Sequence, residues 1–179
     1  MVSRFILCLA LLTACPFACG TAALAEGLQK NLGGPRFFDP ATGGSLCYLR
    51  RYSVDHLNQH PDQRVAAMGL ALMPEVRDQT ILILYVRVRS SVETAVAAAY
   101  CAAQVDGLDC QLTGDAGQFS LTAARNGALR LTVAARGISF EGRRDFITLK
   151  GTTGDDRVFL LPPLGAEPCA RLTVAGELN

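Results

Sequence analysis

Four cysteines are the residues of this 179-residue chain whose number and spacing point most directly to a chemistry. The chain has seven cysteines, and three of them lie before residue 26. The other four are Cys47, Cys101, Cys110 and Cys169. An even number of cysteines in an exported chain predicts two disulfide bonds. A zinc site or a catalytic thiol is the alternative, but the chain has no Cys-x-x-Cys pair and no cysteine stands at ligand spacing from a histidine.

Three pairings of these cysteines can be drawn, and the sequence favours one of them. Residues 104–109 have the composition of a turn between two strand ends, which favours a Cys101–Cys110 bond. Cys47–Cys169 would then join the first strand to the C-terminal segment. Loop-closure entropy gives about 4–5 kcal/mol for that long loop and about 2–3 kcal/mol for the short one.

The first 25 residues have the pattern of an export signal peptide. Arg4 is the only charge before Glu26, an apolar run follows at 5–12, and Ala-Leu-Ala at 23–25 has the small-x-small pattern that signal peptidase recognises. The apolar run is shorter than the roughly 20 residues of a transmembrane helix, so we expect no transmembrane span. Cleavage would release residues 26–179 as a periplasmic or secreted protein.

A second interpretation of the same segment makes Cys15 a lipidation site. Ala14-Cys15 at the end of the apolar run has the form of a bacterial lipoprotein box, in which the cysteine is acylated and becomes the new N-terminus. The product would be a membrane-anchored lipoprotein, held to the membrane only by its lipid. Position 15 is early for that event, and Cys19 would remain in the tether, so signal cleavage is the favoured interpretation.

His56 and His60 are the only two histidines, and they stand four residues apart on a predicted helical turn. Side chains at that spacing share a helix face, where two imidazoles could bind a metal, and Asp55 and Asp62 lie nearby. No glutamate directly follows the first histidine, and no third ligand is evident. We therefore assign no metal, cofactor or catalytic residue, and keep a weak metal-dependent enzyme using His56 and His60 as an alternative.

Two further groups of charged residues could do chemistry. Asp155 and Asp156 could form a carboxylate pair, yet neighbours on a strand point to opposite faces and aspartates are common in turns. Several arginines could converge on an anionic ligand if the fold brings them together; these are Arg50, Arg51, Arg87, Arg89, Arg143 and Arg144. The chain has no nucleophile elbow, P-loop or dinucleotide fingerprint.

The composition argues against several classes of protein. The chain has 17 basic and 16 acidic residues, and loss of Arg4 with the signal peptide balances the two signs. A balanced charge gives no electrostatic attraction for nucleic acid, which we do not expect as a partner. The absence of tryptophan argues against a wide aromatic platform for sugars or bases.

Short runs with a two-residue period dominate the chain after a lead-in rich in glycine and proline. Residues 26–45 form this irregular lead-in, and residues 46–179 form a single β domain. A helix is expected over 53–60 with Ser53 as its N-cap, and 169–174 are expected to be a closing strand or a tail. Strands are expected at 46–52, 64–73, 80–89, 96–103, 108–112, 118–123, 129–134, 138–141, 147–150 and 157–161.

Two of these strands have informative faces. The strand at 64–73 has large apolar residues on one face and small ones (Ala67, Gly69 and Ala71) on the other. The strand at 80–89 is apolar on both faces for much of its length, which indicates that it is covered on each side. Asn126-Gly127 between two alternating runs is a strong hairpin signal. The pattern predicts an all-β fold, an antiparallel up-and-down barrel of about eight strands with one short helix; a two-sheet β-sandwich is the alternative.

The stretches 47–52 and 56–65, together with 155–161 ahead of Cys169, resemble a group of small exported Gram-negative bacterial proteins that has no assigned activity. At the level of fold the pattern is similar to lipocalin-like barrels and to small periplasmic lysozyme-inhibitor barrels. The chain lacks the lipocalin Gly-x-Trp signature, because it has no tryptophan. The resemblance implies an exported protein and no particular activity.

These observations predict an exported, disulfide-stabilised protein that is not an enzyme. Its partner would be a small ligand inside the barrel or an envelope protein at an exposed loop. A lipid-anchored envelope scaffold attached through Cys15 is the alternative.

Overall fold

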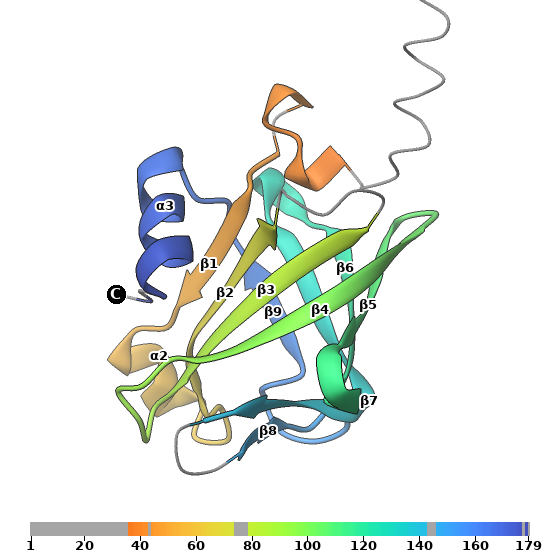
Figure 1. Cartoon of the computed structure of the whole chain (residues 1–179). Coiled ribbons are helices and arrows are strands. Elements are labelled where there is room, and N and C mark those ends of the chain that lie inside the picture. Colours follow the sequence, from red (N-terminus) through yellow and green to blue (C-terminus); the bar gives the residue numbers. More distant parts are fainter. Residues whose placement is uncertain (1–35, 43, 74–78, 143–145, 177, 179) are drawn as a thin grey trace, which may run out of the picture. The chain divides into compact units, whose positions relative to one another are not determined.

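The computed structural model of the chain describes residues 36–42, 44–73, 79–142, 146–176 and 178 (Figure 1). These residues belong to a compact unit that spans Gly33–Asn179. The predicted signal peptide (1–25) and Cys15 lie outside the described residues.

Antiparallel strands make up most of the described chain, and helical segments connect or cover them (Figure 1). Each strand predicted from the sequence overlaps one of the observed strands. The strands are β1 (Cys47–Arg51), β2 (Val65–Met73), β3 (Thr80–Val88), β4 (Ala95–Gln104), β5 (Gly107–Leu112), β6 (Gly117–Ala123), β7 (Leu129–Glu141), β8 (Phe146–Leu149) and β9 (Val158–Leu161). The α-helices are α2 (Val54–Gln59) and α3 (Ala166–Ala175), and the 3-10 turns are η1 (Arg36–Phe38), η2 (Pro40–Thr42), η3 (Thr113–Asp115) and η4 (Arg125–Gly127).

The sheet closes on itself. Strands β1 to β7 pair in sequence order, and β9 pairs with β7. The ring is completed between β1 and the end of β9: the Leu49 N–H donates to the Pro162 carbonyl (3.0 Å), and the Leu164 N–H donates to the Cys47 carbonyl (2.8 Å). Strand β8 pairs with the second half of β7. The predicted all-β, up-and-down antiparallel arrangement is therefore confirmed.

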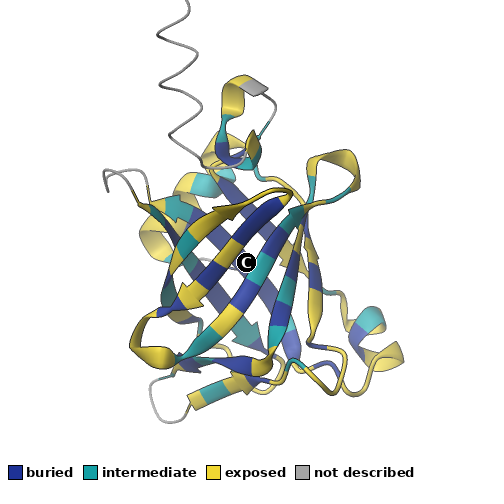
Figure 2. Cartoon of the chain, turned by 90° about the vertical axis from the view of Figure 1, so that its right-hand side faces the viewer, coloured by how far each residue is buried: buried dark blue, intermediate teal, exposed yellow. Residues whose placement is uncertain are grey.

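Apolar side chains fill the interior of this closed sheet. The strands alternate between buried and exposed residues, as Figure 2 shows by colour. One large cluster joins the inward-facing side chains of all the strands in the wall. Its fully buried members include Tyr48, Met68, Leu70, Leu82, Leu84, Phe140 and Phe159. The interior is thus a packed core along the strands that the structure describes.

A second, smaller apolar cluster lies under α3, the helix that Figure 1 shows on the outside of the sheet beside β1. Ala67 and Ala71 on the outer face of β2 pack with Leu172 of the helix and with Leu178 behind it. A Cβ atom on Gly69, between those alanines, would lie 3.1 Å from the Leu178 side chain. The small face of β2 therefore allows α3 to approach closely, and explains why β3 beside it is apolar on both faces.

The prediction that residues 169–174 form a closing strand or a tail is wrong, because they belong to α3. Glu167 in the first turn pairs with Arg171 at 2.6 Å, and Gly176 ends the helix in a left-handed conformation (φ 62°). The segment just after β9 closes the sheet instead.

Two disulfide bonds cross-link the domain. Cys47–Cys169 ties β1 to α3 with Cα atoms 5.4 Å apart, and Cys101–Cys110 joins directly opposed positions of β4 and β5 with Cα atoms 4.1 Å apart. These are the two bonds that the sequence favoured.

Strand β7 corrects a second prediction, since two separate strands were expected at 129–134 and 138–141. The chain continues as one strand of 13 residues that bends at Gly137 (φ 83°). A Cβ atom on Gly137 would lie 2.5 Å from the Leu149 carbonyl oxygen of β8, so only glycine fits. The bend lets the first half of β7 pair with β6 and β9 while the second half pairs with β8.

Gly69→Val should lower the free energy of unfolding by about 1–2 kcal/mol, because a branched side chain would push α3 away from β2. Chemical denaturation gives this value. Ala102→Val, on the exposed outer face of β4, is the matched control and should change stability by less than about 0.5 kcal/mol. Equal effects of the two substitutions would contradict the close packing of α3.

Candidate functional site

One end of the barrel carries both histidines, on and just after α2. The Ser53 hydroxyl accepts a hydrogen bond from the His56 N–H at 3.1 Å, which caps the helix. Leu57 is the buried residue of the helix. The helix predicted over 53–60 is confirmed, and its buried face fixes the direction of the histidine side chains.

Four side chains at this end stack on one another. The guanidinium carbon of Arg50 lies 5.3 Å from the centre of the Tyr52 ring. The Tyr52 and His56 ring centres are 4.8 Å apart, and those of His56 and His60 are 4.4 Å apart. Burial raises the pKa of Tyr52, an effect that the charge of Arg50 opposes and that of Asp156 reinforces.

The histidine nitrogens contact separate partners. Nε2 of His56 lies 3.0 Å from the Gln63 side-chain oxygen, and the Gln63 amide donates to the Val65 carbonyl at 2.9 Å. Nδ1 of His60 lies 3.5 Å from a carboxylate oxygen of Asp155. The two rings stack at 25°, so their in-plane nitrogens do not converge on one ion. Within the described residues no group of three His, Cys, Asp or Glu side chains could hold a metal.

Asp156 is a buried carboxylate held by the backbone at the start of β2. Its side chain is 5% exposed and accepts hydrogen bonds from the Arg64 N–H (2.8 Å) and the Val65 N–H (3.1 Å). Burial raises its pKa against the lowering effect of these bonds and of the Arg64 charge, and the neighbouring Asp155 raises it further. Asp156 thus anchors the loop before β9 to β2, while Asp155 points to His60.

Of the arginines proposed from the sequence as an anion site, Arg51 and Arg87 come together, but on a backbone carbonyl of the chain itself, while Arg89 lies at another place. Arg51 and Arg87 both donate to the Leu178 carbonyl, at 3.0 and 3.4 Å, beside α3. Arg89 points to the turn around α2, where its guanidinium lies 3.4–3.5 Å from the carbonyl oxygens of Leu57, Pro61 and Gln63. Residues 143–144 lie outside the described part of the chain. These arginines hold chain segments in place.

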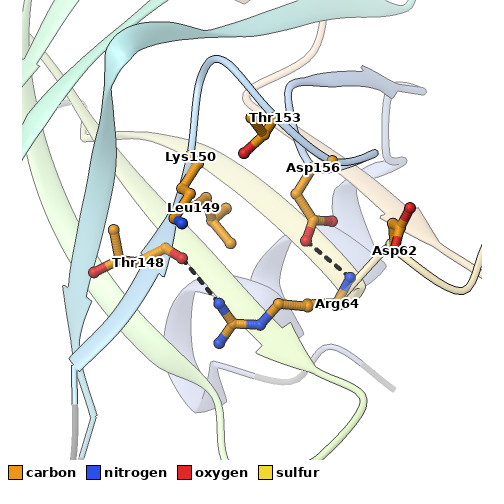
Figure 3. A pocket seen from close by; sticks show the side chains of 8 residues that line it. Asp62, Arg64, Thr148, Leu149, Lys150, Thr153 and Asp156 are labelled. Atoms are coloured by element: carbon orange, nitrogen blue, oxygen red, sulfur yellow. Dashed lines mark hydrogen bonds between the residues drawn. The ribbon is translucent and has the colours of Figure 1, made fainter.

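An open depression of about 420 Å³ lies at the same end, between β8 and the start of β2 (Figure 3). Arg64 points across it and donates to the Thr148 carbonyl at 3.1 Å. Its wall combines cations, carboxylates and hydroxyls; the lining includes Asp62, Arg64, Thr148, Lys150, Thr153 and Asp156.

Arg64 and Lys150 were not singled out by the sequence. The one signal that marks Lys150 is that an arginine-rich chain has a lysine there, and Lys30 is the other lysine. That signal does not place Lys150 near Arg64, because their proximity depends on how the loop before β9 folds over β2.

Comparison of the chain with protein-family models, curated proteins and solved structures found no match. The resemblance to small exported proteins therefore stays a prediction. No helix in the described part of the chain is both long and apolar enough to cross a membrane.

Proposed function

We propose that the chain is an exported, non-enzymatic binding protein whose partner contacts its outer surface. The observation that carries this proposal is the filled interior: the inward-facing residues of the closed sheet form one continuous core. A barrel that carries a small ligand needs an internal cavity, and in small barrels side chains fill that space. Of the two kinds of partner predicted from the sequence, the structure favours a protein or peptide at the surface.

Large apolar side chains on the outside of the barrel support this choice. Val96 and Tyr100 on the outer face of β4 are about half exposed, and so is Leu160 on β9. Phe146 at the start of β8 is 72% exposed. Aromatic side chains are enriched in protein interfaces, where one part of the ring is buried on binding.

Two features support export. The four cysteines after residue 26 form two disulfide bonds, which persist in oxidising compartments and are rare in the cytosol. The signal-peptide pattern of residues 1–25 has the same implication.

The geometry of the polar groups supports a role without catalysis. His56 contacts the Gln63 side chain, His60 contacts Asp155, and Asp156 accepts from the backbone at the start of β2, so each of the three is engaged within the chain. A general base must instead reach a substrate proton directly or through one water.

The test is native mass spectrometry of the protein expressed with residues 1–25 and purified from the periplasm of a bacterial host. We expect the mass of residues 26–179 with both disulfides formed, and no retained small molecule. A host-derived ligand that stays bound would contradict the surface-binding proposal. Free thiols in a chain that remains in the cytoplasm would contradict export, and a diacylglycerol on Cys15 would show export as a lipoprotein.

A further inference from the structure

One edge of strand β8 has no strand partner among the described residues and faces the depression at the end of the barrel. It is the last strand in the order of the sheet and pairs with β7 on one side. The described strands include no partner for its other side. An unpaired strand edge presents a row of N–H and C=O groups to which another extended chain can add.

The hydrogen bonds show which β8 residues present that edge. The Ser139 N–H of β7 donates to the Ala116 carbonyl, away from β8. Ile138 and Phe140 therefore make the ladder to β8, through their partners Leu149 and Ile147.

The backbone groups of Phe146 and Thr148 consequently point away from β7. The Thr148 carbonyl accepts from Arg64 across the depression, which agrees with this direction (Figure 3). At about 3.3 Å per residue the four residues of β8 span about 10 Å, enough to pair with a short extended segment.

Two cations line the depression beside this edge. Arg64 donates to a carbonyl oxygen, and its guanidinium forms no ion pair in the part of the chain described here. Lys150 follows β8 directly, is exposed, and likewise has no ion-pair partner among the described residues. The buried Asp156 carboxylate on the same wall has both oxygens occupied by backbone N–H groups. A carboxylate from outside would therefore find Arg64 and Lys150 available as donors.

We propose that β8 binds an extended peptide segment by strand addition, with a carboxylate of that peptide held between Arg64 and Lys150. The backbone of the peptide pairs with Phe146 and with the Thr148 N–H, while Arg64 keeps the Thr148 carbonyl with one N–H group and offers its other N–H groups to the carboxylate. The exposed Phe146 ring lies on the same strand and offers an apolar contact at one end. This inference rests on the proposed function, because it names the partner class and the surface where binding occurs.

The test is selection of a random octapeptide library, displayed with free C-termini, on the processed protein, which contains residues 26–179. We expect enriched peptides with alternating apolar residues and an acidic residue or the C-terminus at a fixed position. Synthesis of an enriched peptide with a free and with an amidated C-terminus distinguishes a terminal carboxylate from a side-chain carboxylate. Affinity should fall as salt is raised.

Two variants probe the two halves of the site. Lys150→Met should weaken binding of the selected peptide about tenfold or more, and Lys150→Arg should retain most of it. Thr148→Pro removes an edge N–H that is not part of the ladder to β7, so it should fold and lose strand addition. Arg130→Met, which removes an exposed cation from the outer face of β7, is the control and should bind as the wild type does.

Wild-type binding by both Lys150→Met and Thr148→Pro would overturn the proposal, and if Thr148→Pro does not fold, Lys150→Met alone decides. The proposal would also be overturned if no peptides were enriched on the wild type relative to the Lys150→Met protein. That result is expected if Lys150 serves only to prevent other chains from pairing with this strand edge. Dimerisation through β8, seen by sedimentation velocity and abolished by Thr148→Pro, would assign the edge to a second copy and overturn it too. These results leave the proposed function standing, since that proposal is decided separately by the retained-ligand measurement.

Discussion

Replacing Cys47 and Cys169 together by alanine is expected to lower the free energy of unfolding by about 4–5 kcal/mol. The bond closes a loop with a sequence separation of 122, so its loss increases the conformational entropy of most of the unfolded domain. Domains of this size are stable by about 5–15 kcal/mol, and the loss would bring this one close to unfolding. Urea denaturation of the oxidised proteins, followed by far-UV circular dichroism, measures the difference.

The second disulfide provides the matched control. Cys101 and Cys110 have a sequence separation of 9 and join strands that are already paired, so replacing both by alanine should cost about 2–3 kcal/mol. If the short-loop variant were as unstable as the long-loop variant, loop entropy would not explain the stabilisation. The bonds would then act through local packing, such as the docking of α3 on β1.

The strands were predictable because their signals are local. Strand β3 is a continuous apolar run for much of its length, and its two apolar faces indicated cover on both sides, which the core and α3 provide. Strand β4 was harder, since its alanines favour helix by propensity, but pairing with β3 and β5 along its length overrides that preference.

The helix α3 was missed because its own pattern is weak. Leu172 is its one buried residue, so no apolar stripe marks it as a helix. The signal was instead on the partner: the small face of β2 around Gly69 has room for a closely packed element. Gly137 was misread for a related reason, since a glycine within alternating residues can mark a bend in a strand as well as a turn.

The candidate site depends on contacts that spacing along the chain does not specify. The four-residue separation of His56 and His60 correctly placed the two rings side by side, although His60 lies just after the helix. It could not predict that Tyr52 would stack on His56, because Tyr52 lies before the helix and its position depends on how β1 ends. The contact between Arg64 and Thr148 likewise depends on the register of β8 against β7.

Asp156→Ala is expected to lower the free energy of unfolding by about 2–3 kcal/mol, because it leaves the Arg64 and Val65 N–H groups without their acceptor at the start of β2. Asp155→Ala is the control: its carboxylate is partly exposed beside His60, and its loss should cost less than about 0.5 kcal/mol. Chemical denaturation at neutral pH compares the two variants. Similar losses would contradict the anchoring role of Asp156.

The pH dependence of Asp156 provides a second and independent test of its burial. Burial raises its pKa above the value of about 4 in the unfolded chain, so the folded state binds the proton more tightly. Ionisation of Asp156 therefore lowers the free energy of unfolding as the pH rises from the unfolded-state pKa to the raised folded-state pKa. Below this pH window the carboxyl is protonated in both states and the loss is absent. The side chain in the Asp156→Asn variant cannot ionise. The contributions of the other carboxylates to the pH dependence cancel when the two proteins are compared. The stability of the wild type relative to Asp156→Asn should consequently fall as the pH rises through the window. A difference that grew with pH would mean that the two backbone hydrogen bonds outweigh burial and that the folded state favours the charged carboxylate.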